Sequence, residues 1–369
     1  MKASLEKKFK KVEIDFTDDL ITASGGSYFL SQMVRQMVLK KHLCGVKVKR
    51  RQRGVSDADT LLSLIYCLAQ GDGFLSDVDR LGADAVRGGM LDLEGIPDSR
   101  RAGEYLTRFD KNSLEKLNKV SRYQARCVVD DVCKAEQEFQ GYIPVFIDGS
   151  GIEVGGRKFE GAGKLYTGDT GYWLHNIFIG DLWVSQKLHP GGVGVTYDWK
   201  AQMKEDVTAL LQDKENVWVR VDNAYYKKSF VEYCREESWD FSISVTHGKF
   251  KEPLKEELKC LKEDAWVKLD EKSREEAAFI YHQPQGWEEV CPYVVIRRWY
   301  DDNNQKLLIP WHTFILVSRD NLPLKELVRR HRGKQGQENA QKGPLRDMDL
   351  HHPPCKKLIA NQAFILWAK

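Results

Sequence analysis

Three acidic residues have the type and position needed for metal-dependent chemistry. Residues 145–151 read VFIDGSG, so an apolar stretch runs directly into Asp148, and the stretch VWVRVD ends in Asp222. Glu338 falls in HRGKQGQENAQK, where a helix is predicted. Clustered carboxylates repel one another unless divalent cations neutralise them, and hard oxygen ligands suit Mg²⁺ or Mn²⁺. Two such ions about 4 Å apart can activate a water and stabilise the leaving oxygen in phosphodiester cleavage.

Each of these acids also has a plain structural explanation. Asp148 and the glycine after it stand between two apolar runs, a pattern typical of a hairpin turn. Asp222 can cap the helix that follows it. Glu338 can pair with Lys342, one helical turn further on. Taken one at a time, the three acids leave the structural and the catalytic interpretations open.

A second group of candidate metal ligands lies near the C-terminus, in RDMDLHHPP. Asp347 and Asp349 precede His351 and His352, and in an extended chain 347, 349 and 351 point the same way. Gly-Pro before the group and Pro-Pro after it favour a surface loop, which is a poor base for catalytic ligands. We therefore expect Glu338, and not this group, to complete the catalytic site.

The elements that must position these acids fall into two kinds. Helical spacing of apolar residues predicts helices over 27–43 and 57–71, and two more within 99–140, the second of them long. From residue 142 the sequence becomes β-rich, and a β-β-β-α-β-α-β order up to residue 245 indicates a mixed sheet with helices packed against it. Residues 247–322 read as further strands, followed by helices to the end of the chain.

The composition is that of a globular intracellular protein. The 369 residues include 42% hydrophobic and 30% charged residues, with a net charge of only +3. The charged N-terminus is not a secretory signal, no apolar run is long enough to span a bilayer, and the eight dispersed cysteines are expected to be reduced thiols. Any basic surface must therefore be local. The stretch 40–53 contains seven basic residues and no acid, which is consistent either with a DNA contact or with a solvated loop.

Several blocks of the sequence together resemble the DDE transposases of bacterial insertion sequences. VFIDGSGIEVGG is similar to the block around the first aspartate of that family, VRVDNAYYKKSFVEYCREESWDFSISV to the block around the second, and HRGKQGQENAQK to the block around the glutamate. ITASGGSYFLSQMVRQM resembles the N-terminal region, and IANQAFIL resembles the helix beyond the glutamate. Against a Tyr-x2-Arg-x3-Glu-x6-Lys signature carried by one subgroup, this chain has His331, Lys334, Glu338 and Leu345.

The resemblance implies an α+β or α/β fold with an RNase H-like mixed-sheet core. It divides the chain into a helical N-terminal DNA-binding region at 1–140, the first part of the core at 141–246, a β-rich insertion at 247–322, and C-terminal helices of the core at 323–369. Asp148, Asp222 and Glu338 are the implied catalytic and metal-binding residues, holding two Mg²⁺ or Mn²⁺ ions.

The implied function is that of a DDE-type transposase, a polynucleotidyl transferase and endonuclease. Its partners are the terminal inverted repeats of the element and target DNA, with a homodimer in the synaptic complex, no membrane, and a cytoplasmic location at the bacterial nucleoid. The basic residues expected to contact DNA are Arg332, Lys334, Lys342, Lys47, Lys49, Arg50, Arg51 and Arg53. Two alternatives remain: an RNase H-like nuclease without strand transfer, and an inactive or truncated transposase-derived DNA-binding protein.

Overall fold

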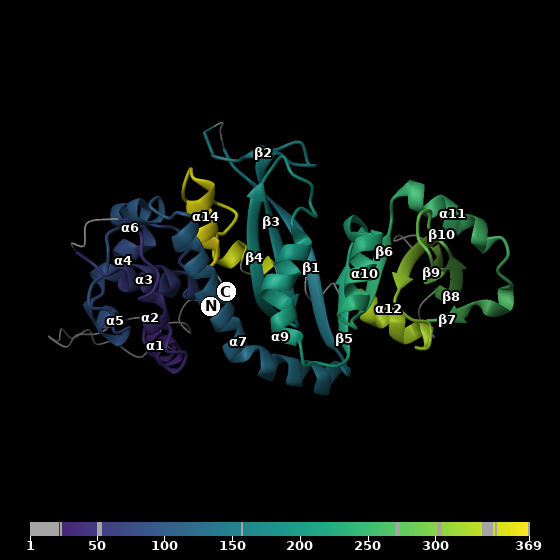
Figure 1. The fold of residues 1–369 in the computed structure, drawn as a ribbon, viewed down its shortest axis with the longest axis horizontal. Coiled ribbons are helices and arrows are strands. Elements are labelled where there is room, and N and C mark those ends of the chain that lie inside the picture. The colour runs from purple at the N-terminus through teal and green to yellow at the C-terminus, as the bar shows by residue number, and fades with distance from the viewer. Residues whose placement is uncertain are drawn as a thin grey trace, which may run out of the picture.

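The computed structural model describes residues 22, 24–49, 54–155, 158–269, 274–300, 305–333, 342–343 and 345–367. The N-terminal helices form one end of the molecule, a sheet runs through its middle, and β7–β10 form the other end (Figure 1). No helix among the described residues is long and apolar enough to cross a membrane.

Seven helices precede the first strand in the described part of the chain. They are α1 (Ser27–Gln36), α2 (Leu39–Leu43), α3 (Asp57–Ala69), α4 (Asp77–Ala83), α5 (Ala85–Met90), α6 (Ser99–Leu106) and α7 (Lys111–Gln140). The single helix expected over 27–43 is in fact two, because Val38 adopts a left-handed backbone with φ of 50°. The long helix expected before residue 140 is α7, which begins at a capping box between Asp110 and Ser113.

The strands form one mixed sheet in the order β2-β3-β1-β5-β6-β10-β9-β8-β7, with β4 added beside β3. Its strands are β1 (Ile143–Glu153), β2 (Gly163–Lys164), β3 (Thr170–Ile179), β4 (Leu182–Pro190), β5 (Val217–Val221), β6 (Asp240–Val245), β7 (Val267–Lys268), β8 (Glu275–His282), β9 (Cys291–Tyr300) and β10 (Lys306–Val317). β1, β5 and β6 pair in parallel and the other neighbours pair antiparallel, so the predicted mixed sheet is confirmed.

The turn considered at Asp148 does not exist. β1 continues without a break from Ile143 to Glu153, and Asp148 pairs with Asn176 of β3. Gly149 is explained by packing, because a Cβ atom there would lie 2.8 Å from Cγ1 of Val195. The glycine that suggested a hairpin is therefore required by a close contact with a residue 46 positions away in the sequence.

The remaining helices cover the two faces of the sheet. They are α8 (Trp199–Met203), the π-helical turn η1 (Lys204–Thr208), α9 (Ala209–Leu211), the 3-10 turn η2 (Asn223–Tyr225), α10 (Lys228–Glu236), α11 (Gly248–Leu258), the 3-10 turn η3 (Glu263–Ala265), α12 (Leu324–Arg332) and α14 (Leu358–Ile365). α8, η1 and α9 follow one another without a break, so a π-helical turn separates two short α-helices.

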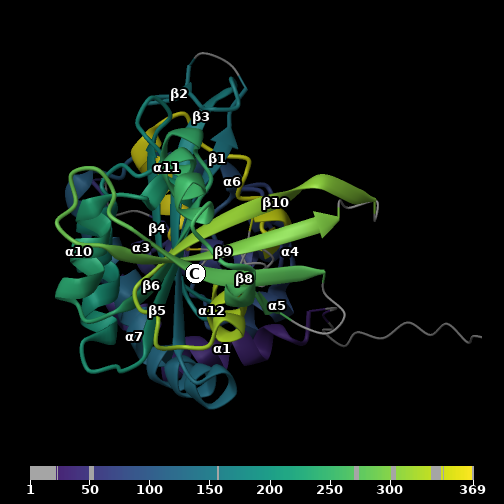
Figure 2. The ribbon, with the colours of Figure 1, turned by 90° about the vertical axis from the view of Figure 1, so that its right-hand side faces the viewer.

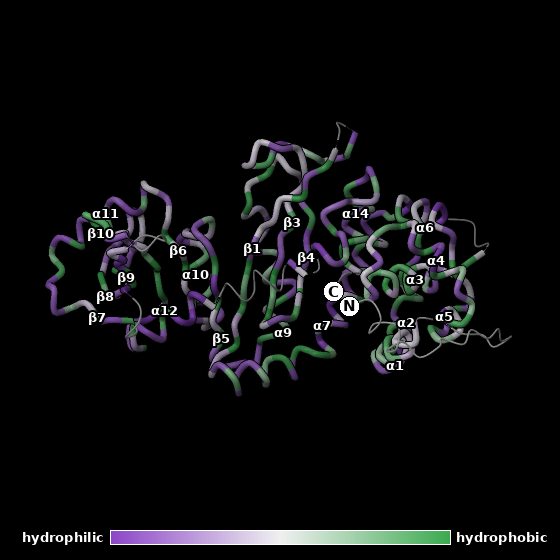
Figure 3. Tube along the Cα trace, turned by 180° about the vertical axis from the view of Figure 1, so that it is seen from behind, coloured by the Kyte–Doolittle hydropathy of each residue, from purple (hydrophilic) through white to green (hydrophobic). Residues whose placement is uncertain are grey.

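Alternate residues of the central strands face separate cores. On one face, Ile147 of β1 packs in the same core as Trp199 of α8 and Phe230 of α10. On the opposite face, Phe146 packs in a core shared with the N-terminal helices and with Phe364 of α14. Figure 3 shows hydrophobic and hydrophilic residues interspersed along the chain. The central strands are buried on both sides.

Residues 247–322 extend the same sheet. β10 pairs with β6 from Phe314↔Val245 to Val317↔Ser242, and β9, β8 and β7 follow it outward. Figure 2 views the molecule from this end and shows β8, β9 and β10 in front of the central strands. The segment is thus β-rich, with α11 packed against it, and it is joined to the core strands by continuous backbone pairing.

Candidate active site

Asp148 lies within β1 and Asp222 comes directly after β5, and these two neighbouring parallel strands place the two residues at the same level of the sheet. The parallel pairing of β1 with β5 ends at Phe146↔Arg220. Each aspartate comes two residues after its member of that pair, and Asp222 keeps an extended backbone with φ −84° and ψ −176°. Because side chains alternate along a strand, both carboxylates project from the same face as Phe146 and Arg220. The structure therefore brings these two predicted site residues together.

The buried hydroxyl of Tyr225 senses both carboxylates. Burial raises the pKa of Tyr225 well above its ordinary value, and the charges of Asp222 and Asp148 raise it further. Both aspartates are partly exposed, so their oxygens remain accessible from solvent. Asp148 and Asp222 thus both lie near enough to this hydroxyl to influence its ionisation.

Backbone amides orient the two carboxylates. Oδ1 of Asp148 accepts a hydrogen bond from the amide of Gly149 at 3.0 Å. Oδ1 of Asp222 accepts one from the amide of Ala224 at 2.9 Å, at the start of η2. The predicted capping role of Asp222 is therefore correct, and it is compatible with a second role for the same carboxylate.

Two buried amides continue the row of oxygens across the sheet. Asn176 pairs with Asp148, and Gln186 of β4 pairs with Asn176. Both side chains are buried, and Asn176 Oδ1 and Gln186 Oε1 have no hydrogen-bond partner among the described residues. A buried oxygen without a donor is costly unless a cation, a water or another donor meets it. Asn176, which is adjacent to Asp148 in the sheet, could therefore offer a further hard oxygen beside that carboxylate, and such oxygens suit divalent cations such as Mg²⁺.

Arg220 fixes the end of α12 above the strand that leads to Asp222. The guanidinium is only 2% exposed, and its Nη1 donates to the carbonyl of Arg330 at 2.9 Å. Burial lowers the pKa of Arg220. Gly333, the residue after α12, lies directly against the same Nη1 and has no room for a Cβ atom. The chain therefore leaves α12 within contact distance of the active-site face.

Replacing Gly333 by Ala is expected to loosen this contact. The added methyl group collides with the buried Arg220 guanidinium, so we expect the free energy of unfolding to fall by about 1–3 kcal/mol, the usual effect of overpacking. Gly192→Ala is the matched control, since a Cβ atom there meets nothing within 4 Å. Urea denaturation of both variants tests this, and equal stability of the two would show that the contact with Arg220 does not hold α12 in place.

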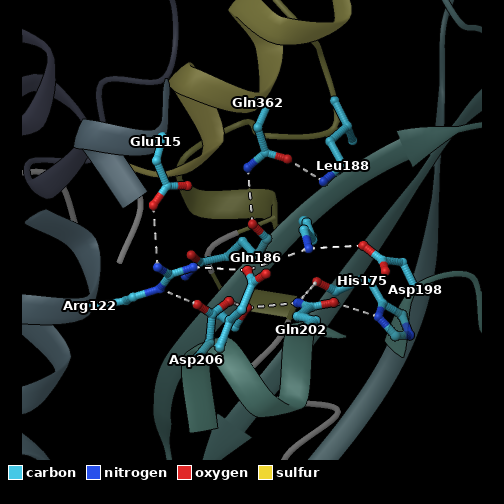
Figure 4. Close-up of polar contacts among 12 residues, drawn as sticks. Glu115, Arg122, His175, Gln186, Leu188, Asp198, Gln202, Asp206 and Gln362 are labelled. Atoms are coloured by element: carbon cyan, nitrogen blue, oxygen red, sulfur yellow. Dashed lines mark hydrogen bonds and ion pairs between the residues drawn. The ribbon is translucent and has the colours of Figure 1, made fainter. Parts of the chain in front are cut away.

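A buried polar network supports the strands from the other face of the sheet (Figure 4). Gln202 of α8 accepts at Oε1 from His175 Nδ1 at 2.7 Å and donates through Nε2 to Ser185 Oγ at 2.7 Å. Ser185 Oγ donates to Asp206 at 2.5 Å, and Arg122 of α7 donates to the same carboxylate at 2.6 Å. The network ties β3 and β4 to α7 and α8, directly behind the acidic face.

The network fixes the protonation state of His175. Gln202 Nε2 also donates to the His175 carbonyl at 3.2 Å, which defines the orientation of the amide and makes His175 Nδ1 the donor to its oxygen. His175 Nε2 is then the acceptor for the Tyr225 hydroxyl. Burial lowers the pKa of His175 below its usual value, which favours the neutral ring. His175 therefore holds Tyr225, the residue that senses both aspartates.

Several of the predicted site residues lie outside the described part of the chain. They are Glu338, Lys334, Arg50, Arg51 and Arg53. Their expected roles stay predictions.

Four of the predicted DNA-contacting residues are described. Arg332 donates to Glu275 of β8 at 2.7 Å, so its guanidinium is already ion-paired. Lys47 lies 3.7 Å from a carboxylate oxygen of Asp57. Lys49 and Lys342 are both exposed. These residues are on the surface, as a DNA contact requires, but the structure does not bring Lys47 and Lys49 to the acidic face.

Sequence inspection missed a basic and aromatic groove between α11 and β10. The groove has a volume of about 570 Å³, and its lining includes Lys251, Lys255, Lys259 and Trp311. Trp311 is 63% exposed, and the Lys251 ammonium lies 5.7 Å from the centre of its ring. The lysines recur every fourth residue of a charged stretch, and this helical period was the signal that could have revealed the surface.

Comparison with known protein families bears directly on this arrangement. The family described as transposase DDE domain group 1 matches residues 5–368. The chain belongs to this family. A search of curated proteins gave no match. The resemblance recognised in the sequence is confirmed, and the match covers both aspartates, the glutamate and the N-terminal helices.

Membership of the DDE transposases establishes the class of chemistry. Members of the family are polynucleotidyl transferases and nucleases that act on DNA and generally use divalent metal ions. The mixed sheet with helices on both faces is consistent with a DDE transposase fold.

Proposed function

We propose that this protein is a DNA transposase that cuts phosphodiester bonds at the ends of an insertion sequence and joins the freed ends to target DNA. The observation that carries the proposal is the alignment of Asp148 with Asp222, two residues beyond the last parallel pair of β1 and β5, in a member of the DDE transposase family. Such a protein works at the nucleoid of a bacterial cell.

Glu338 is the proposed third carboxylate. The chain leaves α12 at Gly333, which lies against Arg220. Arg220 lies on β5, two residues before Asp222. It later reaches α14, where Gln362 bonds to the backbone of β4 on the far side of Asp148. The two ends of the connecting chain thus flank the acidic pair on one face of the sheet, and this supports Glu338 as the residue that joins it.

The donor set fits hard divalent cations. Asp148, Asp222 and Glu338 would hold Mg²⁺ or Mn²⁺, with the unpartnered Asn176 oxygen facing the same row. When bound, such ions supply a Lewis acid that lowers the pKa of a water and stabilises a leaving oxygen. The proposed site holds two such ions.

The chain's own residues bind and orient the DNA. The amides of Gly149 and Ala224 hold the carboxylates in place, so that little reorganisation accompanies the reaction. Lys334, Lys342 and Arg332 would neutralise phosphates beside the cut, and Arg332 would have to exchange its pairing with Glu275 for a phosphate. Hydrolysis frees a 3′-hydroxyl, which then attacks a phosphodiester of the target.

The N-terminal helices and the basic stretch at 40–53 are proposed to bind the terminal repeats, and the lysines and Trp311 of the α11–β10 groove offer a further surface for phosphates and unstacked bases. A homodimer that pairs two element ends fits joining of both ends to one target. The β-rich segment 247–322 is proposed to be an insertion in an RNase H-like core.

Binding by the basic stretch predicts a change in the salt dependence of DNA affinity. Replacing Lys49, Arg50, Arg51 and Arg53 by Ala is expected to flatten the slope of log K against log salt by about 3–4, since each phosphate contact contributes about 0.9. Lys228→Ala with Arg235→Ala is the control, because these residues lie on α10, outside the proposed DNA-binding surfaces, and pair with Glu288 and Glu289. An unchanged slope in the quadruple variant would make the stretch a solvated loop.

A strand-transfer assay tests the function itself. The protein is incubated with Mg²⁺, a labelled fragment carrying the DNA that borders its gene, and a target plasmid. We expect fragment ends to be cut and then joined covalently to the plasmid. Cutting without joining would instead support the nuclease alternative, and binding with neither step would support an inactive DNA-binding protein.

A further inference from the structure

Asp349, His351 and His352 form a compact cluster of metal ligands outside the acidic site. One donor atom from each residue lies within 4.8 Å of the other two. His352 Nδ1 is 2.7 Å from Asp349 Oδ1, and His351 Nε2 is 3.3 Å from the same oxygen. Tetrahedral ligands at bond lengths of about 2.0–2.1 Å stand roughly 3.3 Å apart, so the cluster has the scale of a zinc site.

The hydrogen bond of His351 leaves a lone pair aimed at a carboxylate. His351 Nδ1 lies 2.7 Å from the carbonyl oxygen of Leu345 and must donate a proton to it. In the neutral ring Nε2 is then unprotonated, and it faces Asp349 Oδ1 at 3.3 Å. Two lone pairs at that distance repel each other unless a metal ion or a proton lies between them. A histidine whose other nitrogen donates to a backbone carbonyl is also the usual arrangement of a metal ligand.

The backbone holds Asp349 in an uncommon conformation. Its φ is 50°, in the left-handed region, and its Oδ2 is buried with no hydrogen-bond partner among the described residues. Gly73 packs against this point so closely that a Cβ atom there would lie 2.7 Å from Asp349 Cβ and in collision with the Met348 carbonyl. The loop is thus fixed against the turn that follows α3, and is not the unattached surface loop expected from its prolines.

We propose that Asp349, His351 and His352 bind one transition-metal ion of the zinc class, which stabilises the turn that packs against Gly73. Two imidazoles and one carboxylate suit Zn²⁺, Co²⁺ or Ni²⁺, whereas Mg²⁺ prefers an all-oxygen shell. The ion is structural: its three ligands lie within residues 349–352, so it fixes this turn in the conformation that contacts Gly73. This site shares no residue with the proposed catalytic carboxylates.

Titration with Co²⁺ tests this site apart from catalysis. The full-length protein carrying Asp148→Asn and Asp222→Asn is used, so that the acidic pair does not compete for the ion. We expect one equivalent of Co²⁺ to give the intense visible bands of a four-coordinate N/O site, without the near-ultraviolet band of thiolate ligation. Zn²⁺ should remove the bands and a large excess of Mg²⁺ should not.

Adding His351→Gln and His352→Gln to this protein is expected to abolish the bands. Asp349→Asn should weaken binding at least tenfold while keeping the backbone, because Asn tolerates a left-handed φ. His282→Gln is the matched control, since His282 also lies 3.2 Å from a carboxylate, that of Glu257, but has no second histidine beside it. Absence of the bands in the parent, or bands that survive in the His351 and His352 variant, would overturn the proposal. Circular dichroism spectra confirm that each variant is folded.

Discussion

Asp148→Asn and Asp222→Asn are each expected to reduce DNA cleavage by roughly a hundred- to a thousandfold, the scale found when a group central to transition-state electrostatics is removed. An amide has no charge with which to offset a divalent cation, and the two aspartates share one site. The fold should survive, because each Asn can still accept the backbone hydrogen bond that its aspartate accepts from Gly149 or Ala224. Cleavage of an end-labelled fragment in Mg²⁺ and thermal unfolding are measured together.

Asp181→Asn provides the control for this pair. Asp181 lies in the turn between β3 and β4 and is exposed, so its charge has no part in the proposed site. Cleavage by this variant should stay within a factor of two or three of the parent. The Asp148 and Asp222 variants could instead lose stability while the protein that remains folded cleaves DNA normally. That outcome would show that both residues have only structural roles.

Glu338→Gln is expected to eliminate cleavage while leaving DNA affinity within a few-fold of the parent. The third carboxylate completes the charge that holds the cations, whereas most of the affinity for DNA comes from phosphate contacts spread over the surface. Both quantities are measured on the same fragment, cleavage in Mg²⁺ and affinity by gel shift. A parallel drop in both would indicate a general loss of structure.

Asp347→Ala separates Glu338 from the other acids nearby in the sequence. Asp347 lies two residues before Asp349, in the segment that leads to the proposed zinc-class site. Most of the cleavage activity should remain in this variant. Activity kept in Glu338→Gln and lost in Asp347→Ala would place the third ligand after Pro344 and would remove the basis for the alignment of HRGKQGQENAQK with the family.

The order of strands and helices around the two aspartates could be predicted because it depends on local patterns. β-Rich, aromatic stretches separated by glycines marked β3 and β4, and short apolar runs marked β5 and β6. The turn at Asp148 was wrong because Asp-Gly is also what a strand needs when Val195 packs against its backbone. The same signal serves two structures, and only a contact distant in sequence decides between them.

The side chains that surround the site could not be predicted from their own neighbourhoods. Arg220 bonds to a carbonyl 110 residues away, and His175 of β3 bonds to Gln202, 27 residues further along the chain and beyond β4. The helix α11 was missed because Pro253 lies within it, in a stretch that read only as charged. Sequence patterns predicted a mixed sheet in which apolar stretches run into Asp148 and Asp222, whereas the parallel pairing that brings the two residues level is seen only in the structure.

Anomalous diffraction from a crystal soaked in Mn²⁺ tests the central claim most directly. Mn²⁺ prefers oxygen ligands and replaces Mg²⁺ at such sites. We expect anomalous density between the carboxylates of Asp148 and Asp222, with the Glu338 carboxylate as a further ligand. Density found only at other positions, with the two aspartates bound solely to protein groups, would contradict it.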